Sequence, residues 1–150
     1  VLDHFFGLLP RDTDEASRLA HRHDDRLKDR AWLRAGVDRQ VRHAIEVRHE
    51  SFRDPAFTAL ARRHHVAIVL ADTGERWPVL DEPTADFRYA RLHGDRELYT
   101  SGYDDDTLDR WARRVRGWQQ GGRDGYVYFD NDVQVRAPFD AMALAGRLGA

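Results

Sequence analysis

The side chains most able to do chemistry in this sequence stand at the ends of predicted strands. One strand ends in Glu46 and Arg48, and a later one carries Arg91 and leads into His93. A carboxylate or an imidazole can transfer protons, and a guanidinium binds carboxylate or phosphate groups through two parallel hydrogen bonds. These residue types therefore predict acid–base chemistry on a small anionic molecule.

Each residue of this set has a preferred role. Glu46 is the first choice for a general acid or base, and His93 is the second. Arg48 and Arg91 are the best candidates for an anion clamp. The alternative is that both arginines pair with Glu46 and only hold the fold together, because a buried charge must be paired in either case. Sequence alone leaves both interpretations open.

Further polar and aromatic side chains follow the predicted strands. In a parallel α/β protein the carboxyl ends of all strands lie on one side, so groups that follow different strands converge on one rim. On that basis the additional candidate ligand-binding residues are His49, Asp72, Tyr99, Tyr103 and Asn131.

Strands and helices alternate along most of the chain. The β-rich runs are 43–48, 66–71, 87–92 and 126–129. The second run, VAIVLA, is apolar throughout, as expected for a strand that is covered on both faces. Helical spacing and end signals predict helices over 13–30, 54–63, 104–120 and 141–148, with the tail of another helix over 1–9.

Four strands separated mainly by helices predict parallel βα units with right-handed crossovers. Such units form either an open α/β sandwich or part of a closed barrel, and periodicity does not separate the two. Strand alternation places Glu46 and Arg48 on one face, and it places Tyr89, Arg91 and His93 on one face. We expect the apolar faces to meet helices and the polar faces to line a barrel interior or a crevice.

An ordered set of motifs resembles one known family. The segments EVRHESF at 46–52, AD at 71–72, YARLHG at 89–94 and VYFDND at 127–132 follow the order and spacing of the YecE-like family, domain of unknown function 72. Tyr99, Tyr103 and the APFDA segment at 137–141 match as well. The set covers nearly the whole chain, although Asp130 and Asp140 stand where the family more often has asparagine.

The resemblance implies a fold. The YecE-like family has a TIM-type (β/α)8 barrel, and this chain is similar to its last four βα units, as one domain over residues 1–150. The opening strands of the family have no counterpart here. A half-barrel would expose two sheet edges, so we expect either an N-terminal half outside this sequence or a homodimer partner to complete the barrel.

Composition sets outer limits on the class of protein. Among the 150 residues, 41% are hydrophobic and 33% charged, a globular composition with a polar surface. The formal net charge of −2 gives no reason to expect binding to nucleic acid or to an anionic membrane, and no cysteine is present to act as a nucleophile or ligand. With no apolar run near the ~20 residues that span a bilayer, we expect a cytoplasmic protein. The family resemblance implies a bacterial one.

Three hypotheses about function follow. The first is a barrel that binds, and can transform, a small anionic ligand at the strand ends; as an enzyme it would be a hydrolase, lyase or isomerase with Glu46 as acid or base. The second is a divalent-metal-dependent phosphoesterase or nucleic-acid-processing barrel, although no compact metal motif is present and the cofactor is unknown. The third is a non-catalytic binding module.

Overall fold

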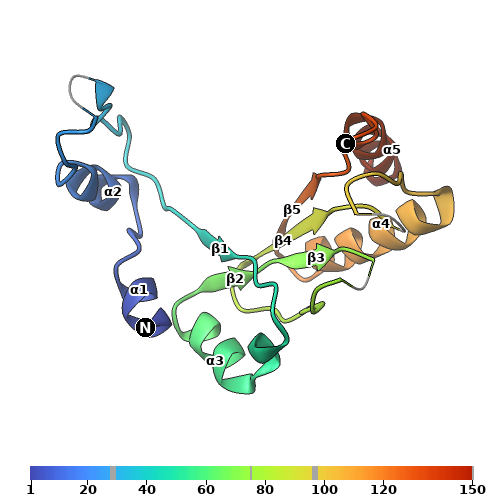
Figure 1. Ribbon diagram of the computed structural model, residues 1–150, viewed down its shortest axis with the longest axis horizontal. Coiled ribbons are helices and arrows are strands. Elements are labelled where there is room, and N and C mark those ends of the chain that lie inside the picture. Colours follow the sequence, from blue (N-terminus) through green and yellow to red (C-terminus); the bar gives the residue numbers. More distant parts are fainter. Residues whose placement is uncertain (28–29, 75, 96–97, 150) are drawn as a thin grey trace. The chain divides into compact units, whose positions relative to one another are not determined.

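The computed structural model describes residues 1–27, 30–74, 76–95 and 98–149 (Figure 1). The chain divides into two compact units, Val1–His43 and Ala44–Ala150, which are described one at a time. The candidate site residues all belong to the second unit.

The first unit contains two short helices, α1 (Leu2–Gly7) and α2 (Thr13–Ala20). The carboxylate of Asp12 caps α2 by accepting a hydrogen bond from the backbone N–H of Glu15 at 2.6 Å. The predicted extension of this helix to residue 30 was wrong, because α2 ends at Ala20. No residue of α2 is buried, and a short helix with little buried surface is only marginally stable in water.

The second unit alternates strands and helices as the sequence predicts. The strands are β1 (His43–Ile45), which begins at the unit boundary, β2 (Val66–Ile68), β3 (Leu70–Asp72), β4 (Phe87–Leu92) and β5 (Asp124–Phe129). The helices are the 3₁₀ turn η2 (Glu50–Arg53), α3 (Pro55–Arg63), α4 (Asp105–Gln120) and α5 (Ala137–Leu148).

Helix starts follow local signals in the sequence. Asp54 accepts from the N–H of Ala56 at 2.8 Å and Asp104 from the N–H of Thr107 at 2.9 Å, so each carboxylate caps the helix that follows it. The last helix begins at Ala137, four residues before the predicted start, since a proline in the first turn needs no intrahelical N–H donor.

The strands form two small sheets. Strands β3, β4 and β5 lie side by side and parallel, with Ala71 opposite Arg91 and Arg91 opposite Tyr128. Strand β2 pairs with β1 instead. The single strand predicted over 66–71 is therefore divided at Val69, whose N–H donates to the carbonyl of Ile45 at 2.9 Å.

A buried threonine completes the hydrogen bonding of β2. The hydroxyl of Thr84 donates to the carbonyl of Val66 at 2.7 Å and accepts from the N–H of Ile68 at 3.1 Å. Two backbone groups that would lack a strand partner are satisfied in this way. The side chain thus replaces a strand where the apolar run changes partners.

The two faces of the three-stranded sheet differ in character. Ala90 and Leu92 of β4 are fully buried against Trp111 of α4 and Leu144 of α5, on the face that both helices cover (Figure 1). Tyr89 and Arg91 alternate with them and are only partly buried. This alternation confirms the predicted assignment of an apolar face to the helices.

No helix in the described part of the chain is both long and apolar enough to cross a lipid bilayer.

We predict that Thr84→Val lowers the free energy of unfolding by about 2 kcal/mol or more, because two buried backbone groups lose their partner. Urea denaturation measures the change. Thr58→Val on α3 is the matched control, since its hydroxyl makes no hydrogen bond to a described residue. Equal effects of the two substitutions would contradict the role of Thr84.

Candidate functional site

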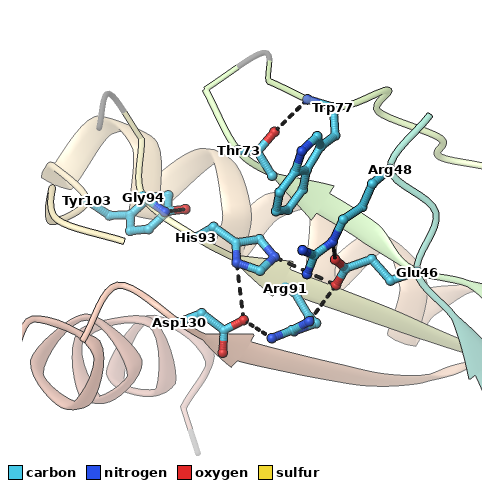
Figure 2. Close-up of polar contacts among 9 residues, drawn as sticks. All are labelled: Glu46, Arg48, Thr73, Trp77, Arg91, His93, Gly94, Tyr103 and Asp130. Carbon is cyan, nitrogen blue, oxygen red and sulfur yellow. Dashed lines mark hydrogen bonds and ion pairs between the residues drawn. The ribbon is translucent and has the colours of Figure 1, made fainter. Parts of the chain in front are cut away.

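Glu46 lies between two arginines at the carboxyl ends of the strands (Figure 2). Its Oε1 accepts from Nε of Arg48 at 2.7 Å, and its Oε2 accepts from Nη1 of Arg91 at 2.6 Å. The Glu46 side chain is 11% exposed, so both carboxylate oxygens are used within a largely buried contact. The segment after β1 is thereby joined to β4.

Arg91 pairs with a second carboxylate in addition to Glu46. Its Nη2 forms an ion pair with Oδ2 of Asp130, which follows β5. Arg48, Glu46, Arg91 and Asp130 therefore form three successive ion pairs, and their formal charges cancel. A balanced series of this kind is the arrangement in which partly buried charges are stable.

His93 lies against the same two carboxylate oxygens. Its Nε2 is 3.7 Å from Oε2 of Glu46, and its Nδ1 is 3.2 Å from Oδ2 of Asp130. The imidazole is completely buried, yet neither ring nitrogen makes a well-aligned hydrogen bond to a described residue. The edges of Trp77 and Tyr99 enclose the ring, with centroid distances of 5.3 and 5.4 Å.

The surroundings set the protonation states of these groups. Burial tends to raise the pKa of Glu46, but hydrogen bonds from Arg48 and Arg91, with their charges, outweigh it and lower that pKa below its ordinary value. Burial lowers the pKa of His93, against the opposing charges of Asp130 and Glu46. At neutral pH the carboxylate is ionised and the imidazole neutral, so both are set to accept protons.

Trp77 supports the outer part of the site. The Arg48 guanidinium lies over the indole ring, 4.0 Å from its centroid, in a cation–π contact. The backbone N–H of Trp77 donates to the Thr73 hydroxyl at 3.2 Å, which anchors the loop that carries the indole (Figure 2). The ring therefore orients Arg48 and closes one side of His93.

A cavity of about 500 Å³ opens beside the ion pairs, on the sheet face that α4 and α5 do not cover. Its polar wall consists of Glu46, Arg91 and Asp130, and its aromatic wall of Tyr89 and Tyr128. The two tyrosine rings stack with a centroid distance of 5.1 Å. This wall has the mixed apolar and polar lining that small-molecule sites use.

Asp72 does not join the other predicted site residues. Its Oδ2 accepts from the indole N–H of Trp111 on α4 at 3.2 Å, on the helix side of the sheet. Burial raises the pKa of Asp72, and the Trp111 hydrogen bond opposes that rise. Asp72 borders a different cavity of about 300 Å³ together with Thr107 and Arg110.

Three other predicted ligand-binding residues make contacts within the fold. His49 caps η2 by accepting from the N–H of Ser51 at 3.2 Å. The Tyr103 hydroxyl accepts from the N–H of Gly94 at 3.0 Å, and burial raises its pKa. The Asn131 amide donates to the Ser101 carbonyl at 2.9 Å. The structure thus brings together Glu46, Arg48, Arg91, His93 and Tyr99 from the predicted set.

Asp130 and Trp77 are members of the cluster that the selected site residues did not include. Alternation along β5 carries a signal for Asp130, because Tyr126, Tyr128 and Asp130 share a face. Trp77 has no comparable signal, since it lies in an irregular loop.

No group of three or more His, Asp or Glu side chains within the described ranges has the geometry to hold a metal ion.

The chain is an α/β protein with parallel strands and a polar cluster at their carboxyl ends, the place where proteins of this class commonly bind ligands. The sequence profile of a family described as "Protein of unknown function DUF72" matches residues 7–150. The chain belongs to this family, which confirms the resemblance seen in its motifs.

Solved structures of two DUF72 family proteins have a similar fold. A protein of Thermotoga maritima superposes with a TM-score of 0.67 at 23% identity, over 73% of this chain and 47% of that one. A protein of Enterococcus faecalis superposes with a TM-score of 0.66 at 17% identity, over 92% of this chain and 53% of that one. The chain therefore spans about half the length of these relatives. No curated protein matches it.

We predict that the cluster makes stability depend on pH. The pKa of His93 is lower in the folded protein than its ordinary 6.5. The contribution of the neutral imidazole to the free energy of unfolding is therefore complete above pH 6.5, and it is lost as the pH falls through the pKa of the folded protein. The lowered pKa of Glu46 has an effect in the same direction, so stability falls further as the pH drops below 4.5. The urea midpoint should fall on acidification from about pH 7.5 to about pH 5.

His93→Gln should flatten that fall, because it removes a group whose pKa is lowered by folding. The exposed His4→Gln in the first unit is the control and should keep the slope of the unchanged protein. A His93→Gln protein whose midpoint falls as steeply as that of the unchanged protein would refute the assignment to His93.

Proposed function

We propose that the protein binds a small anionic ligand at the carboxyl ends of its strands, with Arg48 as the direct contact to the anion. The supporting observation is the state of the Arg48 side chain, which is 50% exposed. Its Nε is bound to Glu46, whereas its Nη atoms have no hydrogen bond or ion pair with any residue in the described part. A guanidinium whose two terminal nitrogens are both free is suited to a carboxylate or phosphate.

Arg91 has a different role in this proposal. Both of its terminal nitrogens already face carboxylates, Glu46 on one side and Asp130 on the other. It therefore orients those carboxylates and balances their charge, while Arg48 meets the ligand. This arrangement combines the two interpretations of the arginines that the sequence leaves open.

We assign proton transfer to Glu46 and His93. An ionised carboxylate beside a neutral imidazole favours proton abstraction from a ligand or from a water molecule. Isomerisation, elimination and hydrolysis all begin with such a step. The cluster therefore supports a base-catalysed reaction as the activity of the site.

The proposed fold is the C-terminal half of a TIM-type barrel. The order β3-β4-β5, with parallel pairing between strands that follow one another in sequence, is what consecutive βα units of a barrel have. Tyr128 on the uncovered face is 51% exposed. Further strands, from an N-terminal segment or from a second copy of the chain, would close the sheet into a barrel around that face.

The anion site is tested by calorimetric titration of the intact protein with inorganic phosphate and with acetate. We expect one of these anions to bind, and Arg48→Ala to weaken that binding about tenfold, the loss typical of one charge-assisted interaction. Arg53→Ala is a matched control, because Arg53 is 52% exposed and its Nε binds Glu50 at 2.6 Å.

Two results would reject the proposal. One is the absence of binding by both anions at millimolar concentration, and the other is an equal loss of affinity in Arg48→Ala and Arg53→Ala. Glu46→Gln separates binding from chemistry, because it keeps a hydrogen-bond acceptor for Arg48 and removes the base.

A further inference from the structure

The series of ion pairs ends in a hydrogen-bond donor, Arg48, on one side and in a hydrogen-bond acceptor, Asp130, on the other. At one end are the Nη atoms of Arg48, which are hydrogen-bond donors with a positive charge. At the other end is Asp130, whose side chain is 26% exposed although its Oδ2 is buried, so Oδ1 provides the accessible oxygen. Figure 2 shows this second oxygen pointing away from Arg91 and His93.

A ligand that contacts both Arg48 and Asp130 needs a different chemical group at each of them. The Arg48 end requires an anion. The Asp130 end requires a hydrogen-bond donor, but its charge is already balanced by Arg91, so a second cation would be repelled by that guanidinium. A neutral hydroxyl group satisfies the oxygen without adding charge.

The cavity that Asp130 borders also suits hydroxyl groups. The phenol oxygens of Tyr89 and Tyr128 make no hydrogen bond to any residue that the structure describes, and both residues line the cavity with Asp130. The stacked rings offer an apolar surface beside these hydroxyls. A short carbon chain bearing several hydroxyls can contact the rings and the oxygens together.

We propose that the ligand of this site is a polyhydroxylated carboxylic acid, whose carboxylate binds Arg48 and whose hydroxyl groups bind Asp130 and the two tyrosines. This assignment rests on the proposed anion site and adds the chemical class of its ligand. An amino acid, which would bring an ammonium group to Asp130, is the nearest competing class.

Four six-carbon probes separate these classes in calorimetric titrations of the intact protein. Gluconate carries a carboxylate and hydroxyls, hexanoate the carboxylate alone, 6-aminohexanoate a carboxylate and an ammonium, and sorbitol hydroxyls alone. We expect gluconate to bind at least about tenfold more tightly than each of the other three, which is the effect of one hydrogen bond to a charged group.

Failure of this inference differs from failure of the anion site itself. Equal affinity for gluconate and hexanoate, or tighter binding of 6-aminohexanoate, overturns the hydroxy-acid assignment and leaves the anion site standing. Binding of sorbitol equal to that of gluconate, or no binding of any carboxylate, overturns both.

Two substitutions locate the hydroxyl contacts. Tyr128→Phe keeps the ring of an exposed residue and removes only its hydroxyl, so folding is preserved. Tyr128→Phe and Asp130→Asn should each reduce the preference for gluconate over hexanoate several-fold, because each removes a contact that only the hydroxyl groups make. Asp132→Asn, at an exposed neighbouring position, is the control and should leave this preference unchanged. If neither Tyr128→Phe nor Asp130→Asn reduces the preference for gluconate over hexanoate, the assignment of its contacts is wrong.

Discussion

The contact on which this site depends is the carboxylate of Glu46 held between two guanidiniums. Each oxygen of that carboxylate accepts one hydrogen bond, from Arg48 and from Arg91, so a segment after β1 is tied to a residue of β4. A largely buried carboxylate without these partners would be costly in free energy. The pairing therefore stabilises the fold and, by lowering the pKa of Glu46, keeps the carboxylate ionised at neutral pH.

The remaining members of the cluster are arranged around that contact. Arg91 extends it to Asp130, and His93 faces the oxygens that Arg91 pairs. An imidazole that is buried among aromatic edges and beside balanced charges stays neutral. In the proposed function, structural pairing and proton acceptance are properties of one network, in which Arg91 holds the carboxylates and Arg48 meets the ligand.

Much of the local structure follows from short-range chemistry in the sequence. Asp54 and Asp104 cap helices because their carboxylates accept from nearby N–H groups, and alternation along β4 assigns Ala90 and Leu92 to the core. The family motifs identify the ends of the strands where the cluster forms. Helix α2 shows the limit of periodicity, since its apolar stripe is thin, none of its residues is buried, and the helix ends at Ala20.

The sequence by itself determined which segments of the second unit alternate as strands and helices, and which family the chain belongs to. It also determined that Glu46, Arg48, Arg91 and His93 lie at one end of the strands. Only the tertiary structure decided that Asp72 turns toward Trp111, because an apolar run has no alternation from which to read a face. It also divided that run at Val69 and brought Trp77 over Arg48. These outcomes depend on contacts between segments that are far apart in the sequence, and the spacing of residues along the chain does not predict such contacts.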